Sequence, residues 1–154
     1  MQVSLITCTS NSEKTIKNCC LSISKQSYDN IEHIISDKNS KDKTISIIKE
    51  YGAKNLIIHE QKSSGIYGAL NEGMKLSNGD IIGILHSDDE FIDKDVIKIV
   101  TEKFSQNDLD VLFSNIFYTK KNDTNKIVRK WKSDLKEGIQ SNNILNKKID
   151  NGWM

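Results

Sequence analysis

The sequence predicts an α/β protein with a mostly parallel central sheet flanked by helices, and two observations carry this prediction. Four short apolar runs alternate with stretches in which apolar residues recur at helical spacing, giving the order β-α-β-α-β-α-β-α. After the fourth helical stretch, two apolar runs flank a polar turn, which predicts a strand pair and a mixed-sheet ending. We therefore expect one α/β domain over residues 1–154.

The predicted strands are short and rich in branched apolar residues. They cover Val3–Cys8, Ile31–Ser36, Leu56–His59 and Ile81–Leu85, followed by the pair Val111–Tyr118 and Ile127–Lys132 around a turn at 122–125. The run Ile81–Leu85 is continuously apolar, which is typical of a central strand covered on both faces.

Four helices are predicted after these strands. The first follows Ser10-Asn11-Ser12-Glu13, which has the Ser-x-x-Glu form of a capping box. The second begins near Asp42, and the fourth covers about Lys94–Phe104. The residues expected to face inward are Ile16, Cys19, Cys20 and Ile23 in the first helix, Ile45, Ile48 and Tyr51 in the second, Ile66, Leu70 and Met74 in the third, and Val96, Ile97, Val100 and Phe104 in the fourth. In the third helix, Ala69 and Gly73 are expected to permit close packing on the sheet.

Composition excludes several classes of protein. The 22 Lys and Arg nearly balance the 21 Asp and Glu, so the chain has no global field that would hold nucleic acid. The longest apolar runs are far shorter than the roughly 20 residues of a membrane span. The N-terminus shows no signal-peptide pattern, and we expect a cytoplasmic protein. Cys8, Cys19 and Cys20 have no metal-ligand spacing and are expected to be small buried thiols.

Polar residues follow three of the predicted parallel strands. They are Thr7-Cys8-Thr9, Asp37, and His86-Ser87-Asp88-Asp89. Open α/β sheets bind ligands outside the carboxyl ends of their strands, so these groups are expected to converge on one site.

Asp88 and Asp89 suggest a metal site. Adjacent carboxylates at the end of a buried strand repel each other unless a cation joins them. Oxygen ligands suit Mg²⁺ or Mn²⁺, and a diphosphate could complete the coordination. The alternative is that these acids only favour the N-terminus of the following helix.

Asp37 and Gly65 are the other candidates for ligand contacts. Asp37 could accept a hydrogen bond from a base or ribose, or it could simply cap the next helix. Ser63-Ser64-Gly65 opens a helix whose N-terminus can face a phosphate. The glycines here do not form a P-loop, no dinucleotide fingerprint follows the first strand, and no nucleophile with a partner base is evident. His33 is expected to be structural, whereas His86 could touch ligand or pack.

Taken together, five segments resemble family 2 glycosyltransferases of the GT-A (nucleotide-diphospho-sugar transferase) fold, from Val3 to Met154. These segments are Val3-Ser4-Leu5-Ile6-Thr7 with Asn11, Asp37-x-x-Ser40-x-Asp42-x-Thr44, Gly65-Ile66-Tyr67-x-Ala69-x-Asn71-x-Gly73, Ser77-x-Gly79-Asp80-Ile81-Ile82-Gly83, and the family's DXD-type site His86-Ser87-Asp88-Asp89. Two later segments, 128–133 and 152–154, resemble a bacterial subgroup that builds surface polysaccharides.

The resemblance implies roles for named residues. Cys8, Thr9, Asp37, Gly65 and Asp88 would bind the nucleotide. Asp89 would ligate Mn²⁺ or Mg²⁺ on the diphosphate of a sugar donor, most simply a UDP-sugar. Arg129 and Trp131 would lie on the acceptor side. The implied reaction inverts the anomeric carbon and transfers the sugar to a glycan or lipid-linked acceptor. Peripheral association with the inner face of the membrane and a homo-oligomer are also implied possibilities.

The sequence departs from the family pattern at Lys38, Lys43 and Gly68, where Gly, Gly and Asp are usual. In the subgroup the catalytic base follows the segment that ends here at Met154, so none is expected within the chain. We therefore expect a truncated transferase, with a donor-binding half at 1–110 and an incomplete acceptor part at 111–154. The alternatives are a catalytically inactive fragment that binds a nucleoside diphosphate, or a receiver-type signalling module.

Overall fold

The computed structural model describes residues 1–120 and 123–132. The chain divides into two compact units, Met1–Thr101 and a second that begins at Glu102, and each is described by itself. No helix among the described residues is long and apolar enough to cross a membrane.

The first unit is built on a four-stranded parallel sheet with the order β3-β2-β1-β4. Its strands are β1 (Val3–Thr9), β2 (Ile31–Asp37), β3 (Asn55–Glu60) and β4 (Ile81–Ile84). The predicted parallel sheet is thus confirmed. The register pairs Thr9 with Asp37 and Asp37 with Glu60, so three strands end level with one another.

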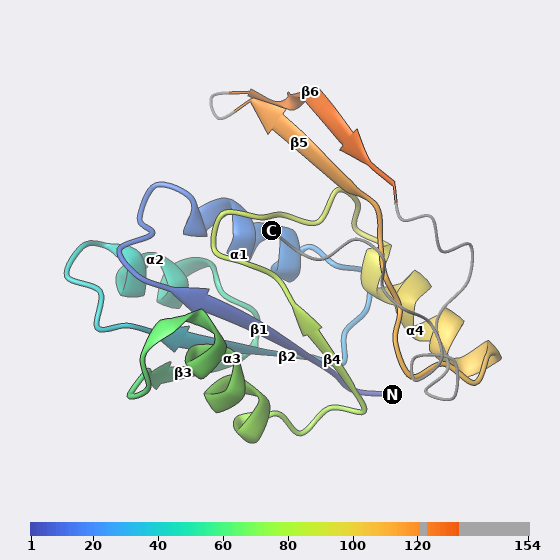
Figure 1. Cartoon of the computed structure of the whole chain (residues 1–154), viewed down its shortest axis with the longest axis horizontal. Helices are drawn as coiled ribbons and strands as arrows, with labels where there is room; N and C mark the ends of the chain where they lie inside the picture. Colours follow the sequence, from blue (N-terminus) through green and yellow to red (C-terminus); the bar gives the residue numbers. More distant parts are fainter. Residues whose placement is uncertain (121–122, 133–154) are drawn as a thin grey trace. The chain divides into compact units, whose positions relative to one another are not determined.

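Helices cover both faces of this sheet. They are α1 (Ile16–Ser24), α2 (Thr44–Tyr51) and α3 (Gly65–Leu76), and α4 (Val96–Gln106) runs from the first unit into the second. Figure 1 shows α3 on the opposite side of the strands from α1 and α2. The inward face predicted for α1 is confirmed, because Ile16, Cys19, Cys20 and Ile23 are all buried.

The inward orientation predicted for Ile66 and Met74 in α3 is wrong, whereas the close packing predicted for Ala69 and Gly73 is confirmed. Ala69 and Gly73 are its buried residues, whereas Ile66 and Met74 are 47% and 41% exposed. The reason is the close approach of α3 to β1, where a Cβ at position 73 would lie 2.6 Å from Cγ2 of Ile6. The small residues thus face the sheet, and the larger apolar residues lie beside the contact.

The capping box predicted at Ser10–Glu13 is also wrong. The first helix begins at Ile16, and its N-cap residue Thr15 makes no side-chain cap hydrogen bond. The Glu13 carboxylate instead accepts a hydrogen bond from the backbone N–H of Lys43, in the loop after β2.

The prediction that Ile81–Leu85 is covered on both faces is corrected for the described residues. β4 is an edge strand of its sheet, and Ile82 and Ile84 are 47% and 52% exposed. Their register with Ser4 and Ile6 places them on the face that α3 covers over β1 and β2.

The second unit contains an antiparallel strand pair, as predicted, but with different bounds. β5 covers Ile116–Lys120 and β6 covers Asp123–Trp131, and the two form a sheet of their own. Val111 makes only an isolated bridge and does not begin a strand. The hairpin is therefore shorter on its first arm and longer on its second than the apolar runs indicate.

Candidate functional site

Asp37, at the end of β2, is buried and accepts three hydrogen bonds. Its Oδ1 accepts the hydroxyls of Thr9, at 2.6 Å, and of Ser40, at 2.5 Å, while its Oδ2 accepts the Ser40 N–H at 2.8 Å. A carboxylate has about four acceptor positions, so Oδ2 keeps one for a further donor. The structure thus brings the predicted residues Thr9 and Asp37 together, and Asp37 also organises the loop before α2.

The loop after β1 is fastened to the loop after β2 by hydrogen bonds in both directions. The backbone N–H of Asn11 donates to Ser40 Oγ, and Asn11 Oδ1 accepts the Lys41 N–H, both at 2.8 Å. The N–H of Ser12 donates to Thr44 Oγ1 at 2.7 Å. Asn11 has a φ of 50°, a left-handed conformation that Asn tolerates better than most residues. These bonds fix the two loops as one rim.

The loop after β4 joins the same rim through Ser87. The hydroxyl oxygens of Ser12 and Ser87 lie 3.1 Å apart. The turn at Ser87 is closed by the Asp89 N–H, which donates to the carbonyl oxygen of His86 at 3.0 Å. The predicted convergence of the three strand ends is therefore present in the structure.

Asp88 and Asp89 are exposed at this rim. The carboxyl group of Asp89 is partly desolvated, which raises its pKa; the charge of Asp88 raises it further, and His86 opposes the shift. A carboxylate whose ionisation is opposed in this way, as in Asp89, is stabilised when a cation neutralises it.

The side chains at this rim can bind a hard divalent cation only if ligands from outside the protein complete its coordination. Within residues 1–120 and 123–132, no group of three or more His, Cys, Asp or Glu side chains could by itself hold a metal ion. Asp88 and Asp89 offer at most two protein ligand groups. Mg²⁺ and Mn²⁺ sites of this kind are completed by water and phosphate oxygens, so the residues fit a metal that arrives with a diphosphate.

Glu72 braces the loop between β3 and α3, a function that the sequence did not indicate. Its carboxylate accepts the Lys62 N–H at 3.1 Å and the Ser63 N–H at 2.7 Å, and it lies 2.8 Å from Nε2 of His59. Interaction with the Ser63 side chain and with these N–H groups lowers the pKa of Glu72 to about 2, although the Ser63 hydroxyl makes no hydrogen bond of good geometry. Its partners lie nine to thirteen residues away, beyond the reach of helical periodicity.

Gly65 begins α3 next to this braced loop. It has a φ of 75°, which favours glycine, and its carbonyl oxygen accepts the Gln61 side-chain amide at 3.0 Å. A Cβ at Gly65 would meet nothing within 4 Å, so backbone conformation rather than space selects glycine. At Gly68, by contrast, a Cβ would lie 2.3 Å from Ser63 Oγ, which explains why no side chain stands there.

Cys8 and His33 differ in what they can contribute to a site. Cys8 is half-buried in β1, and burial raises the pKa of its thiol. His33 is fully buried and its Nε2 lies 3.0 Å from the Thr7 hydroxyl, while burial lowers its pKa to about 4. The prediction that His33 is structural is confirmed.

Arg129 and Trp131 lie on the same face of β6, in the second unit. The register places Arg129 opposite Tyr118 and Trp131 opposite Ile116, and the Arg129 guanidinium is 5.8 Å from the Tyr118 ring centre. The segment 152–154 lies outside the described residues.

Comparison with known proteins finds similarity to glycosyltransferases. Residues 4–153 match the Glycosyl transferase family 2 profile. The chain is 28% identical over 118 residues to the glycosyltransferase GlyG of Streptococcus pneumoniae, covering 75% of this chain and 39% of GlyG. It is 30% identical over 113 residues to the uncharacterized glycosyltransferase EpsJ of Bacillus subtilis, covering 71% of this chain and 32% of EpsJ.

Among solved structures, residues 1–349 of TarS from S. aureus match with a TM-score of 0.66 and 28% identity, over 71% of this chain and 34% of that one. The same protein in complex with UDP-GlcNAc matches with a TM-score of 0.63 and 27% identity, over 71% and 33%. The chain therefore spans less than two fifths of these relatives.

The parallel sheet with ligand-type residues at its strand ends defines a GT-A-type α/β protein. The match over nearly the whole chain goes further, and the chain belongs to glycosyl transferase family 2.

Proposed function

We propose that this chain binds the nucleotide-sugar donor, most simply a UDP-sugar, in a metal-dependent inverting glycosyltransferase of bacterial surface-polysaccharide synthesis. One observation carries the proposal: hydrogen bonds accepted by Asp37 and hydrogen bonds made by Ser12 join the ends of β1, β2 and β4 into a single rim that bears two carboxylates. The TarS structures, which include complexes with UDP-GlcNAc and with UDP, support a uridine nucleotide at an equivalent place.

The residues predicted to contact the donor then have separate chemical roles. The free acceptor position on Asp37 would take a hydrogen bond from the base or ribose, with Cys8 and Thr9 forming the adjacent wall. The N–H groups at the start of α3, near Gly65, would face a phosphate. Asp88 would contact the nucleotide. Asp89 would hold the divalent metal, which when bound neutralises the charge that develops on the leaving diphosphate.

The acceptor side is proposed to lie in residues 111–154, with Arg129 and Trp131 contacting a glycan or lipid-linked acceptor. We assign the base that deprotonates the acceptor hydroxyl to none of the described residues. Three free cysteines among these residues are consistent with a reducing compartment, which supports a cytoplasmic location.

Donor binding and sugar transfer are tested separately, because the chain spans only part of its relatives. Calorimetry should show that UDP binds in the presence of Mn²⁺ and that GDP binds more weakly. Equal affinity for GDP would reject the uridine assignment, and failure of both nucleotides to bind would reject the proposed function.

Release of sugar from a UDP-sugar by purified 1–154 then separates the active enzyme from the alternative, an inactive fragment that binds a nucleoside diphosphate. Measurable turnover, lost in Asp89→Asn, would exclude the inactive fragment. Donor binding without turnover would favour it.

A further inference from the structure

We propose that the β5–β6 hairpin is a docking surface for an anionic lipid bilayer. The charge of the chain is unevenly distributed around this hairpin. Residues 116–132 contain six of the 22 Lys and Arg but one of the 21 acidic residues, so the remaining residues carry more acids than bases. The excess positive charge of this nearly neutral chain is thus concentrated in one short segment. This charge can attract an anionic surface that lies within a Debye length.

Apolar side chains lie exposed among these cations. Ile127 and Val128 are 42% and 57% exposed, and Ile116, Tyr118 and Trp131 are 42%, 49% and 39% exposed. A two-stranded ribbon has no core of its own and is marginally stable in water, so burial of these side chains against another surface would stabilise it.

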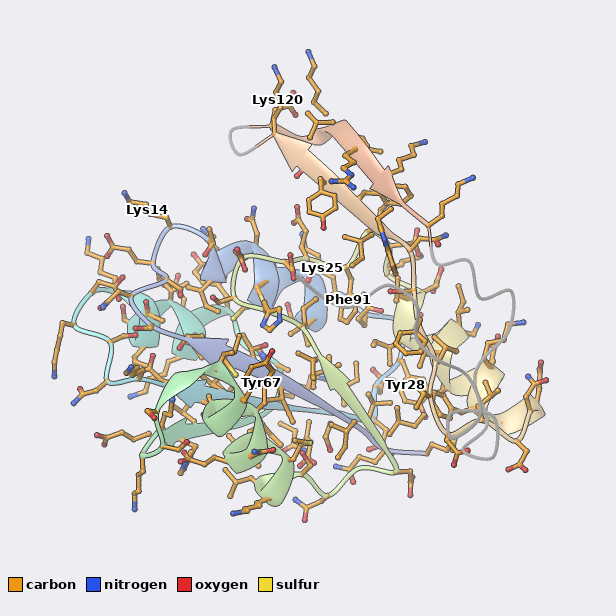
Figure 2. The ribbon with its side chains drawn as sticks, in the orientation of Figure 1. Lys14, Lys25, Tyr28, Tyr67, Phe91 and Lys120 are labelled. Atoms are coloured by element: carbon orange, nitrogen blue, oxygen red, sulfur yellow. The ribbon has the colours of Figure 1, made fainter. Side chains whose placement is uncertain are left out.

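The register places cations beside aromatic rings on both faces of the ribbon. Arg129 lies opposite Tyr118, and Lys130 lies opposite Phe117 with its Nζ 5.6 Å from the ring centre. Lys120 stands at the turn end of β5, and Figure 2 shows its side chain extending away from the strands. Tyr and Trp rings beside Lys and Arg are the combination found at the interface between lipid headgroups and acyl chains.

The exposed aliphatic residues favour a bilayer over a soluble polyanion. A nucleic acid or an anionic glycan offers phosphates or carboxylates and flat rings, which Arg, Lys and aromatic side chains can meet. Such a polymer gives no burial to Ile127, or to Val128 at the irregularity in the β5–β6 pairing. A bilayer takes up both kinds of side chain, charge at the headgroups and aliphatic groups below them.

Vesicle binding by the whole chain tests this proposal. The probe is vesicles of equal parts phosphatidylglycerol and phosphatidylcholine, compared with vesicles of phosphatidylcholine alone. The chain should sediment with the anionic vesicles only, and high salt should release it. In a Trp153→Phe background, the fluorescence of Trp131 should shift to shorter wavelength when these vesicles are added.

Matched charge reversals test whether the hairpin carries the binding. Lys126→Glu/Lys130→Glu should weaken vesicle binding by at least about tenfold. Lys25→Glu/Lys54→Glu, at exposed lysines of the first unit, makes the same change in net charge and should have a much smaller effect. Ile127→Ser/Val128→Ser should weaken binding while all six cations remain. The thermal unfolding midpoint checks that each variant is folded.

Several results would overturn the proposal. The first is failure of the chain to bind anionic vesicles. The second is equal weakening of vesicle binding by the two lysine-pair variants. The third is unchanged vesicle binding in the serine-pair variant, together with tight binding of the chain to a single-stranded oligonucleotide or to heparin. A chain that dimerises through the hairpin, with dimerisation abolished by the serine pair and vesicle binding unchanged, would also overturn it. The measurements use no nucleotide, so they succeed or fail independently of donor binding.

Discussion

Ser12 and Ser87 are separated by 75 positions in the sequence, yet their hydroxyl oxygens lie 3.1 Å apart. This contact joins the loop after β1, which is already fastened to the loop after β2, to the turn that carries Asp88 and Asp89. The geometry of the proposed donor site therefore depends on a pair of neutral, partly buried side chains that have no chemical role of their own.

Removal of either hydroxyl should loosen this junction. Ser12→Ala and Ser87→Ala should each lower the free energy of unfolding by about 1 kcal/mol, the usual net value of one hydrogen bond. The double variant should cost less than the sum, because the bond between the two hydroxyls is lost only once. Urea denaturation of the unmodified chain, the two single variants and the double variant gives the coupling energy between the hydroxyls. Ser46→Ala, on the exposed face of α2, serves as a control. Strict additivity would mean that the two hydroxyls do not interact.

Asp37→Ala should destabilise the fold strongly. It leaves the Thr9 and Ser40 hydroxyls and the Ser40 N–H without their acceptor in a buried place, which should cost about 2–4 kcal/mol. Asp29→Ala, at an exposed position, should change the free energy of unfolding by less than about 0.5 kcal/mol. Denaturant titration measures both, and similar small effects would show that the Asp37 network is not stabilising.

Glu72→Gln should affect donor binding through the loop that precedes α3. The amide nitrogen would replace one carboxylate oxygen, so the 3.1 Å bond from the Lys62 N–H to that oxygen is lost and the remaining bonds lose the support of a negative charge. The start of α3 should therefore become less ordered. The loss of about one hydrogen bond corresponds to roughly fivefold weaker UDP binding. Calorimetry compares this variant with Glu50→Gln on the exposed side of α2. Unchanged affinity would remove Glu72 from the account of the donor site.

His33 should make stability fall as pH decreases through the weakly acidic range. Burial lowers its pKa to about 4 in the folded chain, from 6.5 when unfolded. Between these values the unfolded chain binds a proton that the folded chain does not, so stability is full above pH 6.5 and is lost down to about pH 4. The shift corresponds to about 3 kcal/mol.

His33→Leu isolates this contribution from the other groups that titrate. The difference in free energy of unfolding between His33→Leu and the unmodified chain should change in favour of the variant as pH falls, and then level off below about pH 4. A difference that is independent of pH would mean that folding does not shift the pKa of His33.

The alternation of apolar runs and helical stretches predicted the parallel sheet of the first unit. It also predicted the edge of that sheet at which the candidate site lies. Parallel strands bring their carboxyl ends to one edge, so strand order alone predicts that Thr9, Asp37 and the segment His86–Asp89 lie together. The inward face of α1 followed from periodicity, because all four residues at helical spacing are buried.

The errors arose where tertiary contacts decide local structure. Glu13 has the spacing of a capping residue, but it pairs with Lys43 on another loop. In α3 helical spacing placed Ile66 and Met74 inward, but the close approach to Ile6 buries only the small residues Ala69 and Gly73, whose close packing was predicted. Glu72 was missed for a similar reason, because its partners belong to a loop and a neighbouring strand.

Asp89 is proposed to bind a divalent metal on the diphosphate of the donor. Calorimetric titration of UDP into the chain, with and without Mn²⁺, tests it most directly when repeated on Asp89→Asn and on Asp80→Asn, an exposed carboxylate on the loop before β4. We expect UDP binding to require Mn²⁺, to remain intact in Asp80→Asn, and to weaken by at least about tenfold in Asp89→Asn. Binding of UDP that is indifferent to Mn²⁺, or that Asp89→Asn leaves unchanged, would contradict it.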